Sequence, residues 1–204
     1  MSIKTLTLAV GAALTAASMT AAIPVSAQNQ AVEEFTAFAI NTNSRPTGGS
    51  RPSTASLTIT IERWSTDEEQ NQLMAIINEQ GSNTRRMNDA LLSAFQQLPR
   101  VGRLRESTSL GWDLRYARQT PLAEGGRQIL LATDRPIPMW EARNQPRTFD
   151  YRFTVLDMRL NKANEGEGKM LTDTRLIVDR RTNNIVLEHY DIQPVRLNQI
   201  RRRN

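Results

Sequence analysis

The stretch SLTITIERWSTDEEQNQLMAIINEQGSNTRRMNDALLSAFQQLP, residues 56–99, contains the clearest secondary-structure signals in the chain. In its first part Leu57, Ile59 and Ile61 alternate with polar residues. This period of two predicts a β-strand over 56–64 with one face buried and one face in water.

Two helices are predicted after this strand. Ser65 is placed to cap the first helix from residue 66, with Glu68 completing a capping box, and Gly81 is placed to end it. The second helix lies between Thr84 and Pro99, and its apolar residues recur at helical spacing. These apolar residues are Met87, Leu91, Ala94, Phe95 and Leu98. A short connection predicts that the two helices are antiparallel and lie against a sheet.

From residue 101 onward the pattern becomes that of strands joined by hairpins. Trp112, Leu114 and Tyr116 alternate with polar or small residues and predict one buried strand face. Phe153 and Val155 are in one phase, whereas Leu156, Met158 and Leu160 are in the other, so we expect a bulge near residue 156. The segment 161–169 is predicted as a hairpin loop, and a second turn is predicted at 182–184 between strands at 170–178 and 185–192.

This order of elements predicts an α+β fold with an antiparallel sheet, open or barrel-like, of about six to eight strands. The two short helices are inserted after an early strand. We expect a single domain over 56–200, preceded by an N-terminal segment and a Gly/Pro/Ser-rich loop over 28–55. Residues 201–204 are expected to form a basic tail outside the domain.

The first 27 residues have the pattern of a secretory signal peptide. Lys4 precedes an apolar region, and Val25, Ser26 and Ala27 form a small-residue cleavage site, so cleavage is expected between Ala27 and Gln28. Because the chain has no cysteine, it has neither a lipid-anchor acceptor nor a disulfide. No later apolar run is long enough to span a membrane. We therefore expect a bacterial protein that is periplasmic or secreted.

The formal net charge of +5 depends on a few residues at the ends of the chain. Without Lys4 and the three arginines at 201–203 the charge falls to +1. Export, and the absence of basic strands interleaved with aromatic residues, argue against a nucleic-acid partner. The three arginines do allow an electrostatic contact with an anionic envelope surface.

The chain lacks the residue sets of most catalytic sites. With no cysteine and a single histidine, His189, it can form neither a thiolate site nor a His-rich metal cluster, and we predict no catalytic residue, metal or cofactor. A pair of carboxylates is the remaining enzymatic route, because two acids are sufficient for glycoside hydrolysis. The candidate acids are Asp113, Asp134, Glu141 and Asp150.

The segment 130–147 is the most unusual part of the sequence, because it combines three prolines, a tryptophan, three arginines and two acids in a long connection. An aromatic ring near guanidinium groups suits an anionic or aromatic ligand, or a protein partner. The alternative is that Trp140 only fills the core and that Asp134 pairs with a nearby arginine. The candidate binding residues are Trp112, Tyr116, Arg135, Trp140 and Arg143.

Five segments resemble those of a family of uncharacterised exported bacterial proteins. They are WSTDEE (64–69), LPRVG (98–102), LGWDLRYARQTPL (110–122), LATDRPI (131–137) and WEARNQPR (140–147). The resemblance covers roughly residues 35–200 and implies export and a single domain. It carries over no activity and no site residue.

Three functions are compatible with these observations. The first is a non-enzymatic periplasmic or envelope module that binds a small molecule, a glycan or an envelope protein near Trp112, Tyr116 and Trp140. The second is a carboxylate-dependent hydrolase acting on a glycan or ester. The third is a binder of anionic envelope surfaces that uses the arginine tail.

Overall fold

The computed structural model describes residues 33–41, 53–81, 83–107, 110–137, 152–172, 174–188 and 194–203. The signal peptide, Trp140, Arg143, Glu141, Asp150 and His189 lie outside these ranges. The elements are β1 (Glu33–Asn41), β2 (Ser53–Ile61), α1 (Asp67–Gln80), α2 (Thr84–Gln97), β3 (Gly102–Glu106), β4 (Trp112–Pro121), β5 (Arg127–Thr133), β6 (Thr154–Leu160), β7 (Glu165–Thr172), β8 (Leu176–Asp179), β9 (Asn184–Leu187) and β10 (Val195–Arg203).

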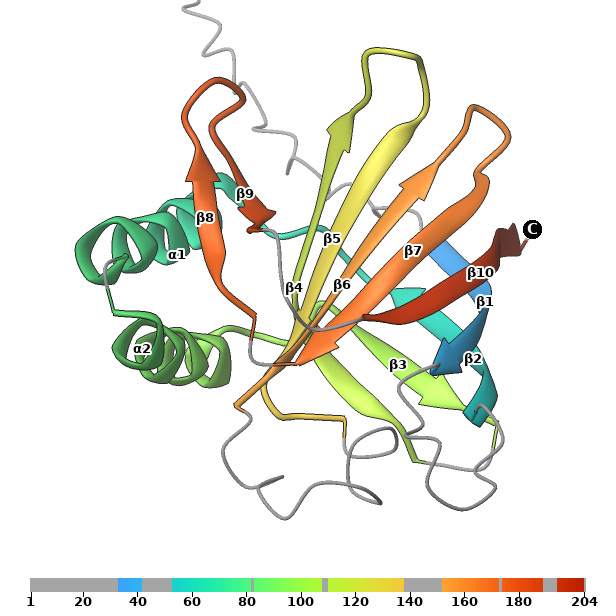
Figure 1. Ribbon diagram of the computed structural model, residues 1–204, viewed down its shortest axis with the longest axis horizontal. Helices are drawn as coiled ribbons and strands as arrows, with labels where there is room; N and C mark the ends of the chain where they lie inside the picture. The colour runs from blue at the N-terminus through green and yellow to red at the C-terminus, as the bar shows by residue number, and fades with distance from the viewer. Residues whose placement is uncertain are drawn as a thin grey trace, which may run out of the picture.

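Eight of these strands close into an antiparallel barrel in the order β1-β10-β7-β6-β5-β4-β3-β2 (Figure 1). Strands that follow one another in the chain are neighbours in the barrel, with two insertions. The helices α1 and α2 separate β2 from β3, and the hairpin β8–β9 separates β7 from β10. The α+β fold, the antiparallel sheet and the two helices are thus confirmed, and the sheet is closed rather than open.

The barrel uses more of the chain than the expected domain, 56–200. β1 precedes residue 56 and pairs with both β2 and β10, so the N-terminal segment supplies a barrel strand. The three arginines expected to form a tail lie in β10, where Arg201 is paired in register with Thr36 and Arg203 with Glu34. Both differences have one cause, because a barrel closes only when its first and last strands meet.

The interior of the barrel is filled by apolar side chains from all eight strands. Phe35, Ile59, Leu104 and Leu131 are among those with no exposed surface. Two tryptophans, Trp64 and Trp112, pack against this cluster while only partly buried. Interiors of eight-stranded barrels are narrow enough for side chains to fill.

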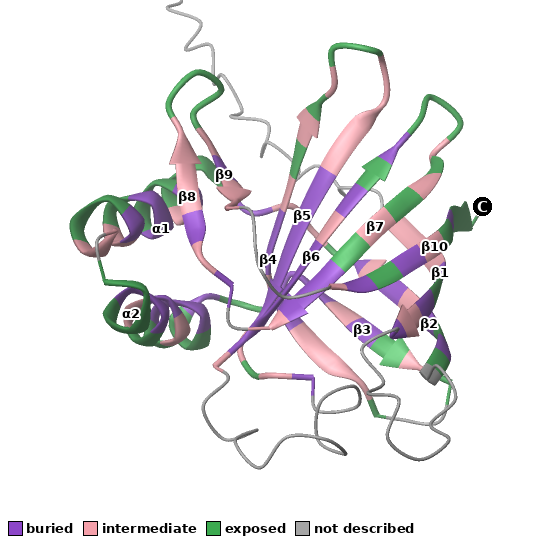
Figure 2. Ribbon diagram, viewed as in Figure 1, coloured by how far each residue is buried: buried purple, intermediate pink, exposed green. Residues whose placement is uncertain are grey.

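A second apolar cluster, which we call the helical layer, lies between the helices and the outer face of β4, β5 and β6. Leu73, Met87, Leu91 and Phe95 from the helices pack there against Phe153 and other residues of the sheet. The rings of Phe95 and Phe153 meet edge to face, with centroids 5.2 Å apart. In Figure 2 buried residues form an almost unbroken stretch along β5, because both faces of this strand are covered.

This second layer explains why the expected bulge near residue 156 is absent. β6 keeps a regular register with β5 and β7. Phe153 and Val155 face the helical layer, whereas Leu156 and Met158 face the barrel interior. Both phases of the sequence are therefore buried without a slip.

Register shifts occur instead in β4 and where β10 pairs with β1 and with β7. The register between β4 and β5 shifts between Leu114 and Tyr116, so one extra residue, Arg115, is accommodated there. Leu114 faces the barrel interior, but Tyr116 faces the helical layer. The prediction that Trp112, Leu114 and Tyr116 share one face is therefore wrong.

The start of α1 differs from its prediction by one residue. Thr66, not Ser65, caps the helix, and its hydroxyl accepts from the backbone N–H of Glu69 while the Glu69 carboxylate accepts from the N–H of Thr66. Ser65 is buried and is bonded to β4, because its hydroxyl accepts from the N–H of Ala117 at 3.1 Å. The first helix therefore begins where the chain leaves the barrel wall.

The predicted loop over 161–169 is shorter than expected, because β7 begins at Glu165. Gly166 and Gly168 are strand residues close to β6. A Cβ on Gly166 would lie 1.9 Å from the backbone oxygen of Arg159, so only glycine allows this approach.

No helix in the described part of the chain is long and apolar enough to cross a membrane.

Candidate functional site

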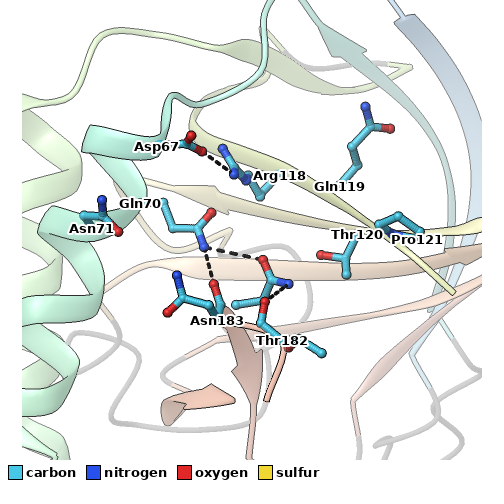
Figure 3. Close-up of a pocket in the computed structure, with 10 residues that line it drawn as sticks. Asp67, Gln70, Asn71, Arg118, Gln119, Thr120, Pro121, Thr182 and Asn183 are labelled. Atoms are coloured by element: carbon cyan, nitrogen blue, oxygen red, sulfur yellow. Dashed lines mark hydrogen bonds and ion pairs between the residues drawn. The ribbon is translucent and has the colours of Figure 1, made fainter. Parts of the chain in front are cut away.

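A polar cleft of about 440 Å³ lies outside the barrel, where three segments converge. The first turns of α1, the last residues of β4 and the turn between β8 and β9 form its walls (Figure 3). We call it the α1–β4 cleft. The residues that line it are Asp67, Gln70, Asn71, Arg118, Gln119, Thr120, Pro121, Thr182, Asn183 and Asn184.

Gln70 is the most unusual residue of the cleft, because its side chain is polar and only 3% exposed. Its amide nitrogen donates to the backbone oxygen of Asn183 at 2.7 Å and to Oδ1 of Asn184 at 3.4 Å. Since a backbone carbonyl can only accept, the nitrogen has to face Asn183, and this fixes the position of the amide oxygen. Oε1 of Gln70 has no hydrogen-bond partner.

The unpaired oxygen points into the cleft. In Figure 3 it is turned away from the β8–β9 turn and toward the side of Arg118. A buried acceptor without a donor costs about 1–3 kcal/mol relative to a paired one. A ligand that donates a hydrogen bond to Oε1 would therefore remove this cost, which the protein alone does not offset.

Arg118 forms the opposite wall and is held in place by two contacts. Its Nη2 lies 2.5 Å from Oδ1 of Asp67, and its Nη1 donates to the backbone oxygen of Ser65 at 3.0 Å. The guanidinium group therefore has its charge balanced by the first carboxylate of α1. The cleft is consequently polar with little net charge.

The β8–β9 turn presents Asn183 in a fixed conformation. Asn183 has a φ of 50°, in the left-handed region that asparagine tolerates. Hydrogen bonds from the Thr182 hydroxyl and the Arg181 backbone N–H to Asp179 close the turn and lower the pKa of this carboxyl. The turn was predicted from the sequence, but its contact with Gln70 was not.

These groups suit binding better than hydrolysis. The lining residues carry five amide side chains, two hydroxyls and one carboxylate, that of Asp67. A two-carboxylate mechanism needs a second acid facing the same space, and none of the lining residues supplies it. Within the described ranges no group of three acidic or histidine side chains could hold a metal ion.

The two acids proposed for hydrolysis that lie within the described residues are engaged elsewhere. Asp134 accepts from Nε of Arg115 at 2.8 Å, and Asp113 lies 3.6 Å from Arg103. The acid whose pKa is raised, Asp157, is on β6: burial raises this pKa, and a hydrogen bond from Gln128 offsets part of the effect. Asp157 does not line the α1–β4 cleft.

The predicted binding residues do not form one site in the described structure. Tyr116 is 2% exposed within the helical layer, and Trp112 packs on the barrel interior cluster. Arg135 is exposed at the end of β5, beside Asp134 at 3.9 Å. Trp112 and Tyr116 were grouped because regular alternation would place them on the same face of one strand. The bulge in β4 puts them on opposite faces.

The arginines at 201–203 are not a free tail. Arg203 binds Glu34 at 2.5 Å, and Nε of Arg201 lies 3.5 Å from Glu165. The backbone N–H of Arg202 donates to the backbone oxygen of Asn164 at 3.2 Å. Two of the three arginines that suggested binding to an anionic surface are thus paired with acids on the adjacent strands.

Neither protein-family models nor curated proteins nor solved structures match this chain when it is compared with them. The resemblance to an exported family therefore stays a prediction, and the functional argument depends on the geometry of the cleft.

Proposed function

We propose that this chain is a non-enzymatic binding module of an exported bacterial protein, and that it holds a polar, uncharged ligand in the α1–β4 cleft. The observation that supports this most strongly is the buried, unpaired Oε1 of Gln70, aimed into a cleft that is otherwise lined mostly by amide and hydroxyl side chains and by the Arg118–Asp67 pair. Export is the part of the proposal that depends on residues 1–27.

The balance of charge supports an uncharged ligand. Arg118 and Asp67 neutralise one another at 2.5 Å, and the remaining lining side chains carry no charge. A strongly anionic ligand would have to displace Asp67 from Arg118. A ligand rich in hydroxyl or amide N–H groups can instead bind without disturbing that pair, and this description covers a small molecule, a glycan or a segment of an envelope protein.

The barrel interior is a less suitable place for a ligand. Large buried side chains, such as those of Phe35, Leu57 and Ile59, occupy it. Eight-stranded barrels that hold a ligand leave this space open. The proposed site is therefore on the outside of the barrel, at the margin of the helical layer.

The test is titration calorimetry of the full chain against neutral oligosaccharides and short blocked peptides, with the variants Gln70→Leu and Gln72→Leu. We expect Gln70→Leu to lower affinity about tenfold or more, because it removes the acceptor that the ligand satisfies. Gln72→Leu makes the same change on the exposed face of α1 and should leave affinity within about twofold. Equal binding by wild type and Gln70→Leu would contradict the proposed site.

A further inference from the structure

β4 is longer than β3, so part of the β4 edge that faces β3 has no neighbouring strand in the described structure. β3 pairs with β4 only at Trp112, Asp113 and Leu114. Beyond this point Ser65, which lies outside the sheet, is hydrogen-bonded to the backbone of β4 on this edge, and the chain then enters α1. The edge of β4 from Gln119 to Pro121 adjoins the α1–β4 cleft.

The contacts of Ala117 show which backbone groups face this edge. Ala117 accepts from the N–H of Ser65 at 2.8 Å, and its own N–H donates to the Ser65 hydroxyl at 3.1 Å. In an antiparallel strand alternate residues direct both backbone groups to the same side. Gln119, two residues further on, therefore directs its N–H and C=O toward the open edge.

The side chain of Gln119 is directed elsewhere. Its Oε1 accepts from Nη1 of Arg127 at 2.7 Å, and Figure 3 shows it pointing away from the cleft. Gln119 therefore presents its backbone, not its side chain, to a ligand. Pro121 ends this edge and has no N–H to donate. Proline is common at edge strands, where it limits pairing with the strands of other chains.

We infer that the α1–β4 cleft binds an extended peptide segment that continues the line of Ser65 and pairs with β4 at Gln119. One residue of the peptide donates its N–H to the C=O of Gln119 and accepts from its N–H. A donor of a neighbouring residue satisfies Oε1 of Gln70 across the cleft. This inference rests on the proposed function and names the class of its ligand.

The walls of the cleft favour a peptide over a sugar. A peptide carries a donor and an acceptor at the spacing that an edge strand offers, which is how strand addition recognises its ligands. The lining amides of Gln70, Asn71, Asn183 and Asn184 offer the same groups as a peptide backbone. The ten lining residues include no aromatic ring on which a sugar could stack.

The experiment selects a phage-displayed library of random heptapeptides against the full chain and then scans a selected peptide by N-methylation. Each N-methyl group removes one backbone donor. If the peptide pairs as a strand, methylation of the residue opposite Gln119 and of the neighbour that donates to Oε1 of Gln70 should each weaken binding about tenfold or more, and methylation of the other neighbour should weaken it less than about threefold. Hydrogen exchange at the Gln119 amide should slow on binding.

Gln119→Pro tests the same pairing from the protein side. An edge strand tolerates proline, so the variant should fold, and unchanged circular dichroism and melting temperature check this. We expect it to weaken a selected peptide about tenfold or more, because it removes the donor of β4.

The remaining outcomes separate this inference from the proposed function. Peptides that bind regardless of N-methylation or of Gln119→Pro would overturn strand addition. If oligosaccharides bind, are weakened by Gln70→Leu and no peptide binds, the peptide inference fails and the proposed function stands. If neither class of probe binds the wild-type chain, both are wrong.

Discussion

The barrel interior and the helical layer are both buried and apolar, yet they are completed in different ways. The interior is enclosed by strands that return to their starting point, so its boundary is closed around the barrel axis. The helical layer covers only β4 to β6 and ends beside α1 in the polar α1–β4 cleft. The comparison shows that the space for a ligand lies outside the barrel, in the α1–β4 cleft at the margin of the helical layer.

The largest expected effect comes from truncating the interior. Phe35→Ala should lower the free energy of unfolding by about 3–5 kcal/mol, because Phe35 has no exposed surface and its removal leaves a cavity in a closed barrel. Urea denaturation followed by circular dichroism measures the loss. Phe38→Ala, on the same strand but 38% exposed, is the matched control and should cost much less. Equal losses of unfolding free energy in the two variants would show that packing inside the barrel contributes no more to stability than packing on its exposed face.

Truncation within the helical layer should have a more local effect. Leu91→Ala should lower the free energy of unfolding by about 2–5 kcal/mol. We expect amide exchange to accelerate in α1 and α2 while β1, β2 and β10 keep their protection, because these strands do not contribute to the helical layer.

Gln96→Ala, on the exposed face of α2, is the control for Leu91→Ala and should leave both stability and exchange nearly unchanged. Uniform loss of protection in helices and barrel strands would show that the two clusters unfold as one unit. That result would remove the distinction between the two regions.

The smallest effect is expected at Tyr116, on the side of the helical layer that β4 forms. Burial raises the pKa of Tyr116 well above its ordinary value of 10.0. The folded state therefore keeps this phenol protonated at a pH where the unfolded chain ionises, and stability is lost as pH rises above 10. The loss should be at most about 1.4 kcal/mol per pH unit.

Tyr116→Phe should remove this part of the pH dependence and leave stability near neutral pH little changed. Urea denaturation of both proteins at pH 9, 10 and 11 measures the difference in slope. A parallel decline of wild type and variant would show that the Tyr116 phenol is not protected by the helical layer.

Much of the fold could be predicted from the sequence, because period-two alternation and helical spacing are local signals. The helices were placed almost to the residue, and the α1 cap differed by one because Ser65 bonds to Ala117, a contact distant in sequence. The bulge expected in β6 is absent, and the register shifts lie in β4 and where β10 pairs with its two neighbours. Periodicity shows that a residue is buried, but it does not distinguish burial inside a barrel from burial under a helix.

The candidate site could not be predicted in the same way. Gln70 lies among polar residues at the start of α1 and has no sequence feature that marks it as buried. Its burial depends on a turn 113 residues away. The available signal was the turn-forming sequence at Asn183 and Asn184, which predicted a turn but not what the turn would contact.

The pairing of β1 with β10 also has a consequence during synthesis. Glu34 and Arg203 are partners on adjacent strands of the barrel although 169 positions separate them in the chain. At bacterial or eukaryotic rates of about 5–20 residues per second, β1 waits roughly 10–30 seconds for its second neighbour. β1 keeps one unpaired edge throughout that interval, and β7 has one from the time it is made until β10 follows, so both edges are open to pairing with other chains until the last strand closes the barrel.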